Sequence, residues 1–321
     1  MTRSRYFGRR SWLLVSGLAW LSVAGAFGAR GAAAATPVAL TDESEPNNTA
    51  GTANGLDFGY LPGAVAAGAI EASGADYYSF SGTAGARVWI DVDTGSPPAQ
   101  LGSSTDSRVD LFGTDGTTLI EFDDDDGTGN GADATVETLL ASVIAGRVLP
   151  GTGTFFVRVQ SFSAFTIDPY RLYVHVNSLA PALEAEPNDN SSTANILVAS
   201  GSRVGFTLGG HMAGENDFYS ATLQASDRVL IGLDCDPDRD GVSTNVRFQL
   251  RGTDGITPII SGASGQESGN FTAEGLAFDI PATGTYFIRV FSSSGVSTGD
   301  YTLLVASYPG PDVFQDGFEN E

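Results

Sequence analysis

The chain has 321 residues, enough for two domains of ordinary size, and it carries a formal net charge of −22 with no lysine. The lack of lysine excludes Schiff-base and lysine-base chemistry. The single cysteine, Cys235, excludes an intrachain disulfide, and we expect it to be a small buried strand residue. The acidic balance disfavours nucleic acid and anionic lipid as partners and suits divalent cations.

The first 35 residues have the pattern of an export signal. Four arginines among the first ten residues precede an apolar run over 12–27, and Ala33-Ala34-Ala35 offers a small-residue cleavage site. The Arg9-Arg10 pair keeps twin-arginine export open beside the general route. Eleven arginines and all 38 acidic residues follow the signal, so the processed chain would carry a charge of about −27. We expect a periplasmic, extracellular or cell-surface protein.

After the signal, the pattern predicts short strands. Residues typical of turns interrupt runs of Val, Ile, Phe and Tyr roughly every 8–12 residues, as in all-β sandwiches or barrels. The run 86–93 places Val88, Ile90 and Val92 on one face. Residues 107–123 are expected to form two strands joined by an Asp115-Gly116 turn. No window shows a helical period of useful length.

The sequence repeats itself at an offset of 141 residues. The phrase ESEPNNTA, beginning at Glu43, returns as EAEPNDNSSTA at Glu184. Further segments match in the same order: 76–79 with 217–220, 113–116 with 252–255, 153–159 with 284–290, and 170–172 with 301–303. We therefore expect two copies of one β domain, over 43–178 and 184–307, and an acidic tail over 308–321.

The ordered motifs of both copies resemble the bacterial pre-peptidase C-terminal domain. The motifs are Glu45–Asn48, Asp76–Phe80, Asp115-Gly116 and Gly153–Phe155 in the first copy, and Glu186–Asp189, Asp217–Tyr219, Asp254-Gly255 and Gly284–Tyr286 in the second. This resemblance implies two tandem jelly-roll-like antiparallel β-sandwich domains. Such domains are usually appended to a secreted peptidase and are not themselves catalytic. A more distant similarity to the collagen-binding domains of bacterial collagenases implies bound calcium.

The repeated phrase concentrates oxygen-bearing side chains of the kind that bind Ca²⁺. Two carboxylates spaced two residues apart on an extended segment point the same way, and a more distant aspartate could complete the set. By resemblance, the ligand sets are Glu43, Glu45, Asn47, Asn48 and Asp76 in the first copy and Glu184, Glu186, Asn188, Asp189 and Asp217 in the second. Because Asn48 stands where the second copy has Asp189, the first site should bind calcium more weakly. The alternative is that Glu-Pro-Asn only fixes the first strand through asparagine turns.

Two further acidic stretches are candidates for calcium-binding or solvated loops. Asp236, Asp238 and Asp240, followed by Gly241, spell D-x-D-x-D-G, the start of a calcium-binding loop. Position 12 of such a loop would be Arg247, so an EF-hand is excluded; a simpler calcium loop and a solvated acidic turn both stay open. The run 123–131 is expected to be a solvated loop.

Catalytic signals are sparse. Of the two histidines, His175 lies in an alternating strand and is expected to face solvent or a strand neighbour, and His211 lies in a glycine-rich turn. No H-E-x-x-H motif and no cysteine–histidine zinc spacing occurs. The aromatic side chains of Tyr77, Tyr170, Tyr173 and Tyr286 suit either a binding surface or the core.

The sequence thus favours an exported, non-catalytic, calcium-stabilised protein that recognises an extracellular macromolecule, either a matrix protein or a polysaccharide. One alternative is a secreted hydrolase with a carboxylate- or histidine-based site. The other is a structural cell-surface spacer.

Overall fold

The computed structural model describes residues 40–58, 63–94, 106–125, 140–198, 205–261, 273–292 and 297–308. The expected signal over 1–35, the expected tail beyond residue 308, and residues 126–131 of the acidic run lie outside these ranges. No helix in the described part of the chain is long and apolar enough to span a membrane.

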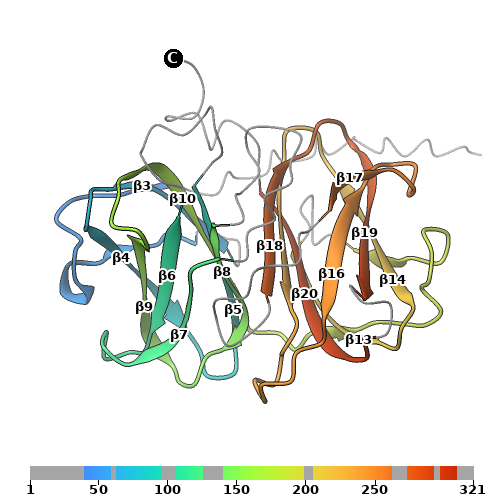
Figure 1. Cartoon of the computed structure of the whole chain (residues 1–321), viewed down its shortest axis with the longest axis horizontal. Coiled ribbons are helices and arrows are strands. Elements are labelled where there is room, and N and C mark those ends of the chain that lie inside the picture. Colours follow the sequence, from blue (N-terminus) through green and yellow to red (C-terminus); the bar gives the residue numbers. More distant parts are fainter. Residues whose placement is uncertain are drawn as a thin grey trace, which may run out of the picture. The chain divides into compact units, whose positions relative to one another are not determined.

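Two five-stranded sheets form the first sandwich (Figure 1). Its strands are β1 (Leu40–Asp42), β2 (Asn54–Gly55), β3 (Gly63–Ile70), β4 (Ala75–Gly82), β5 (Arg87–Asp93), β6 (Ser107–Phe112), β7 (Leu119–Asp123), β8 (Ser142–Val148), β9 (Gly153–Ser161) and β10 (Ile167–Asn177), with a 3-10 turn at Ala50–Thr52. The sheet ordered β1-β3-β10-β5-β8 is called the β10 sheet, and the sheet ordered β2-β4-β9-β6-β7 is called the β9 sheet.

The second sandwich repeats this arrangement strand for strand. Its strands are β11 (Ala182–Leu183), β12 (Asn195–Leu197), β13 (Gly205–Met212), β14 (Asn216–Leu223), β15 (Arg228–Asp234), β16 (Val246–Arg251), β17 (Pro258–Ser261), β18 (Ala273–Asp279), β19 (Gly284–Ser292) and β20 (Gly299–Tyr308). They form the β20 sheet, β11-β13-β20-β15-β18, and the β19 sheet, β12-β14-β19-β16-β17. The protein is all-β and consists of two tandem β-sandwiches, as predicted.

Each sandwich has a hydrophobic core between its two sheets. Val88, Ile90 and Val92 of β5 all lie in the first core, as the alternation predicted. Cys235 is fully buried in the second core, as expected, but it lies directly after β15 and not within a strand. The predicted hairpin is also present: β6 pairs with β7, and Gly116 in the turn has φ +68°, a conformation that favours glycine.

The repeated phrase connects the two sheets of each sandwich. β1 pairs with β3 at the edge of the β10 sheet, and β2 pairs with β4 at the edge of the β9 sheet. Residues 43–53 therefore cross from one sheet to the other, and residues 184–194 make the same crossing in the second sandwich. These four short pairings are parallel, because the segment reaches each edge through a crossover and not through a hairpin. The other strand pairs among the described residues are antiparallel.

A third hydrophobic cluster joins the β10 sheet to the β20 sheet. It includes Trp89 and Tyr173 of the first sandwich and Leu230 and Tyr308 of the second. The two sandwiches accordingly belong to one compact unit.

Buried charges cross the same contact. Arg228 of the second sandwich donates a hydrogen bond of 2.9 Å to the Tyr173 hydroxyl and lies 3.5 Å from the Asp93 carboxylate. Arg239 lies 3.3 Å from Glu121 of the first sandwich. Removing one partner of such a pair would leave an uncompensated buried charge, so these contacts favour one relative arrangement of the two sandwiches.

His175 lies in this contact, although the sequence suggested solvent or a strand neighbour. It is 2% exposed, and its Nδ1 lies 3.1 Å from the hydroxyl of Tyr308 in the other sandwich. The strand alternates as expected, but the second sandwich covers the face of β10 that points away from the first core. Of the four tyrosines left open between surface and core, Tyr170, Tyr173 and Tyr286 are buried, and Tyr77 is partly exposed.

Burial lowers the pKa of His175 to about 4. Between pH 6.5 and about 4 the unfolded chain binds a proton that the folded protein excludes, so stability falls as the pH drops through this window. We expect His175 to contribute a loss on the order of 3 kcal/mol between pH 7 and 4. Urea unfolding at both pH values, compared with His175→Gln, measures it. An equal pH dependence in the variant would contradict this assignment.

Candidate metal sites

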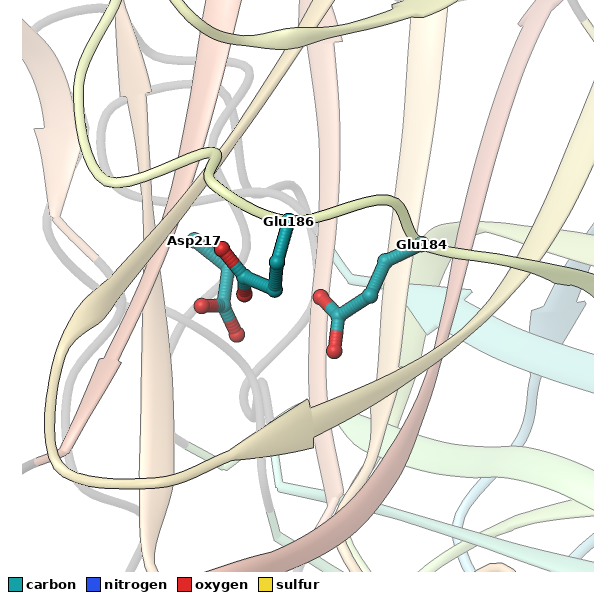
Figure 2. Close-up of side chains that lie close together, drawn as sticks. All are labelled: Glu184, Glu186 and Asp217. Carbon is teal, nitrogen blue, oxygen red and sulfur yellow. The ribbon is translucent and has the colours of Figure 1, made fainter.

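The second copy of the repeated phrase and β14 bring three carboxylates together. Oxygen atoms of Glu184, Glu186 and Asp217 lie within 4.8 Å of one another, and Figure 2 shows these side chains converging from two segments of the chain. Glu184 and Glu186 are two residues apart on the crossing segment, so their side chains share a face. Asp217 extends from the start of β14 and is fully buried.

Two tyrosines orient these carboxylates. The hydroxyl of Tyr301 donates to Asp217 Oδ2 at 2.6 Å, and that of Tyr219 donates to Glu184 Oε2 at 2.7 Å. The two hydroxyls lie 2.6 Å apart. The other oxygen of Glu184 accepts a hydrogen bond from the backbone N–H of His211. Because Tyr219 is in β14 and Tyr301 in β20, this network links the crossing segment to both sheets.

The first copy has a related network, but there Glu43 Oε2 is buried and accepts no hydrogen bond from the described residues. Tyr170 donates to Asp76 Oδ2 at 2.8 Å, and its hydroxyl lies 2.7 Å from that of Tyr78. Glu43 Oε1 accepts a 3.0 Å hydrogen bond from the backbone N–H of Ala69. Burial, followed by the charge of Asp76, raises the pKa of Glu43 to about 8, and burial raises the pKa of Asp76 to about 6.

A buried asparagine holds each crossing segment in place, and its side-chain oxygen accepts no hydrogen bond from the described residues. Asn47 and Asn188 are fully buried, and their backbone N–H groups donate to the glutamates two residues earlier, at 2.9 and 2.8 Å. Their backbone carbonyls accept hydrogen bonds from Tyr77 and Phe218. The side-chain Oδ1 atoms of both asparagines, and Oδ1 of Asp217, are buried and accept no hydrogen bond from the described residues.

These unmet oxygens fit a hard cation. A buried polar atom without a partner costs about 1–3 kcal/mol, and Ca²⁺ binds carboxylate, amide and carbonyl oxygens. Asn48 and Asp189, the next residue in each crossing segment, are exposed. In the first sandwich, a pocket of about 490 Å³ lined by Glu45, Asn48, Glu71 and Asp76 adjoins the site. The structure thus brings three carboxylates of the second set within 4.8 Å of one another, whereas no such three-carboxylate group forms among the described residues of the first set.

Burial raises the pKa of Asp217 to about 7, and the charges of Glu184 and Glu186 contribute to the rise. Without a cation, these carboxylates are thus close enough to oppose one another's ionisation.

Gly210 lies directly beneath this network. A Cβ atom there would approach the ring of Tyr301 to 2.2 Å. We expect Gly210→Ala to destabilise the protein by about 1–3 kcal/mol through overpacking and to displace the Tyr301 hydroxyl from Asp217. Thermal unfolding measures the loss. Gly205→Ala, in the same strand with nothing within 4 Å of the added Cβ, is the matched control. Equal effects of the two changes would contradict this packing.

The loop with Asp236, Asp238 and Asp240 forms the second compact acidic group among the described residues, with oxygens within 4.8 Å of one another. Asp236 is buried, and its carboxylate accepts backbone hydrogen bonds from Asp240 at 3.2 Å and Gly241 at 3.1 Å. The loop is therefore closed by its own backbone, and a calcium loop at this position remains a prediction.

A pocket of about 680 Å³ lies beside the second site. Glu184, His211, Asp238, Asp300 and Tyr301 are among its lining residues. His211 is in β13, not in the expected turn, and its Nδ1 lies 2.5 Å from Asp300 Oδ1. This contact raises the pKa of His211.

The tyrosine pairs were not predicted as site residues. The sequence suggested only a surface or core position for Tyr170, and Tyr78, Tyr219 and Tyr301 appeared only inside repeated motifs. The signal was present, because both pairs recur at matching places in the two copies: Tyr78 with Tyr219 and Tyr170 with Tyr301.

The fold defines a tandem β-sandwich protein, with a candidate metal site in its second sandwich and a related acidic segment in its first. Residues 74–161 match the model of the family described as the bacterial pre-peptidase C-terminal domain. This match covers β4 to β9 and confirms the predicted family resemblance for that part of the first sandwich.

Solved structures provide only distant similarities. The periplasmic inhibitor of g-type lysozyme from Aeromonas hydrophila is 13% identical, with 44% of this chain and 98% of the inhibitor covered and a TM-score of 0.24. The tandem CBM51 modules of a family 98 glycoside hydrolase from Streptococcus pneumoniae are 12% identical, with coverages of 77% and 83% and a TM-score of 0.26. TM-scores this low identify no function. No curated protein matches the chain.

Proposed function

We propose that this protein is an exported, non-catalytic binding protein in which calcium fixes the first segment of each sandwich. The observation that carries the proposal is the duplicated Glu-x-Glu-Pro-Asn segment. In both copies it meets a buried aspartate and leaves a buried asparagine oxygen without a donor. The holding residues would be Glu43, Glu45, Asn47, Asn48 and Asp76 in one site and Glu184, Glu186, Asn188, Asp189 and Asp217 in the other. Calcium would supply the positive charge that these oxygens lack.

The repeated topology supports treating the second sandwich as a further copy of the same module. The resemblance to collagen-binding domains favours a matrix protein as the partner, and a polysaccharide is the alternative. The net charge of −22 disfavours nucleic acid.

Thermal unfolding with EDTA and then with added Ca²⁺ tests the metal sites. A site present only in the folded state stabilises it by about 2.7 kcal/mol at a hundredfold excess over Kd. We expect a calcium-dependent rise in Tm that Glu184→Ala reduces, with exposed Asp42→Ala as the control. A rise that is lost in Asp238→Asn instead would assign the ion to the 236–240 loop. No rise would contradict calcium binding.

Binding to immobilised collagen and polysaccharides separates a binding protein from a structural spacer, which would retain neither. The hydrolase alternative rests on the His211–Asp300 contact in the 680 Å³ pocket. Turnover of ester or glycoside substrates that disappears in His211→Ala would support the hydrolase and contradict the non-catalytic assignment.

A further inference from the structure

The outward face of the β19 sheet carries an ordered array of aromatic and arginine side chains. In β14, β16 and β19, core residues alternate with residues that face away from the core. The strand register places nine outward residues in three rows: Asn216–Phe291–Arg247, Phe218–Arg289–Gln249 and Ser220–Phe287–Arg251. These nine residues are called the β19 face below.

The arginines of the β19 face are fixed by rings and amides. The Arg289 guanidinium lies 4.4 Å from the centre of the Phe291 ring and donates to Oδ1 of Asn216 and, at 3.3 Å, to Oε1 of Gln249. The Arg251 guanidinium lies 5.2 Å from the centre of the Phe218 ring and donates to Gln249 at 2.9 Å. These partners are neutral, so they orient the guanidinium groups without cancelling their charge.

Arg247 completes the positive array. Its Nε is buried and has no hydrogen-bond partner among the described residues. The carboxylate whose charge acts on Arg251 is Asp254, which lies beyond the end of β16. Asp254 accepts hydrogen bonds from the backbone N–H groups of Ile256 and Thr257 in its own turn. The face thus presents three guanidinium groups and no carboxylate of its own.

The first sandwich shows this surface when a carboxylate of its own partly neutralises it. Asp110 takes the place of Gln249, because each stands opposite the central arginine of its sheet, Arg158 or Arg289. Asp110 is fully buried and accepts hydrogen bonds of 2.8 Å from both Arg108 and Arg158. An aspartate in one copy and a glutamine in the other therefore separate a self-paired face from one with free positive charge.

We propose that the β19 face is the docking surface for an acidic polysaccharide. Guanidinium groups take carboxylate or sulfate oxygens in pairs, and the partly exposed rings of Phe287 and Phe291 provide apolar contact for sugar rings. The β19 face is a positively charged patch on a chain of net charge −22. A polymer with sparse charges can lie on this face alone, whereas nucleic acid carries a charge at every residue and meets the acidic remainder.

This inference rests on the proposed function, namely that the protein is a binding module, and it names the partner class. Binding of the full chain to immobilised hyaluronan and lightly carboxymethylated dextran, with neutral dextran as the reference, tests it by surface plasmon resonance. We expect binding to the acidic polymers that weakens as sodium chloride rises from about 0.05 to 0.3 M.

Gln249→Asp places on the β19 face the carboxylate that Asp110 provides in the first sandwich and should lower the affinity about tenfold or more. The fold should tolerate it, because Asp110 occupies the same place in the other copy. Arg247→Gln, which removes a guanidinium group whose Nε has no described partner, should weaken binding severalfold and serves if Gln249→Asp unfolds. Gln160→Asp adds the same charge to the outward face of the first sandwich and should change affinity less than about twofold.

Unchanged affinity in folded Gln249→Asp and Arg247→Gln, equal binding to neutral dextran, or equal binding to single-stranded DNA would each overturn the proposal. If no acidic polymer binds while calcium stabilises the protein and collagen or neutral glycan is retained, this inference fails and the proposed function stands. If nothing binds and calcium has no effect, both fail.

Discussion

Replacing Trp89 with alanine is expected to destabilise the protein by about 3–5 kcal/mol. Trp89 is 2% exposed and lies in the hydrophobic cluster between the β10 and β20 sheets. A Cβ atom on Gly232, across this contact, would approach its ring to 2.7 Å, so the indole fills the space that this glycine leaves. Truncation removes that buried surface and opens a cavity that rigid strands on both sides cannot close.

Urea unfolding at equilibrium measures this effect. Leu119→Ala is the control, because Leu119 is 45% exposed in β7 and should change stability by less than about 1 kcal/mol. A single cooperative transition is expected in both proteins. A loss below about 1 kcal/mol for Trp89→Ala would show that the contact between the sandwiches adds little to stability.

Asp217→Asn is expected to stabilise the protein strongly without calcium and only slightly with calcium. The pKa of Asp217 is raised to about 7 in the folded protein, so between pH 3.8 and 7 the folded state holds a proton that the unfolded chain releases. Stability therefore falls as pH rises through this window. At pH 8 without calcium, the asparagine should stabilise the protein by up to about 4 kcal/mol, because it removes this cost. With calcium in hundredfold excess over Kd, the wild type gains about 2.7 kcal/mol of metal stabilisation that the variant lacks, so the advantage of the asparagine should shrink to about 1 kcal/mol.

Chemical unfolding at pH 8 with EDTA and with Ca²⁺ gives both values. Asp42→Asn, an exposed aspartate at the end of β1, should be neutral in both conditions. A destabilised Asp217→Asn protein in EDTA would mean that the carboxylate has a structural role independent of metal, and would contradict its assignment as a calcium ligand whose charge is unfavourable without the ion.

The sequence was sufficient for the fold because several local signals agreed. Val88, Ile90 and Val92 alternate along β5, Gly116 occupies a turn that needs positive φ, and the offset repeat predicted a second copy of the same sandwich. Each of these signals depends on residues close together in the chain or on a direct comparison of its two halves.

The contacts between sandwiches could not be predicted in the same way. His175 has the pattern of a strand residue with an exposed face, and only the tertiary arrangement places Tyr308 over it. The candidate metal-site residues on the crossing segments could be predicted from the sequence, because Glu184, Glu186 and Asn188 are close together in it. The tyrosines that orient their carboxylates come from other strands, so local spacing does not identify them.

The most direct test of the calcium sites is the number of calcium ions bound per chain, measured by isothermal titration calorimetry after EDTA treatment. We predict two ions in the wild-type protein, with the weaker site in the first sandwich, and one ion after Glu184→Gln combined with Asp217→Asn. Absence of calcium binding, or binding unaffected by that double substitution, would contradict the assignment of the repeated Glu-x-Glu-Pro-Asn segments as calcium sites.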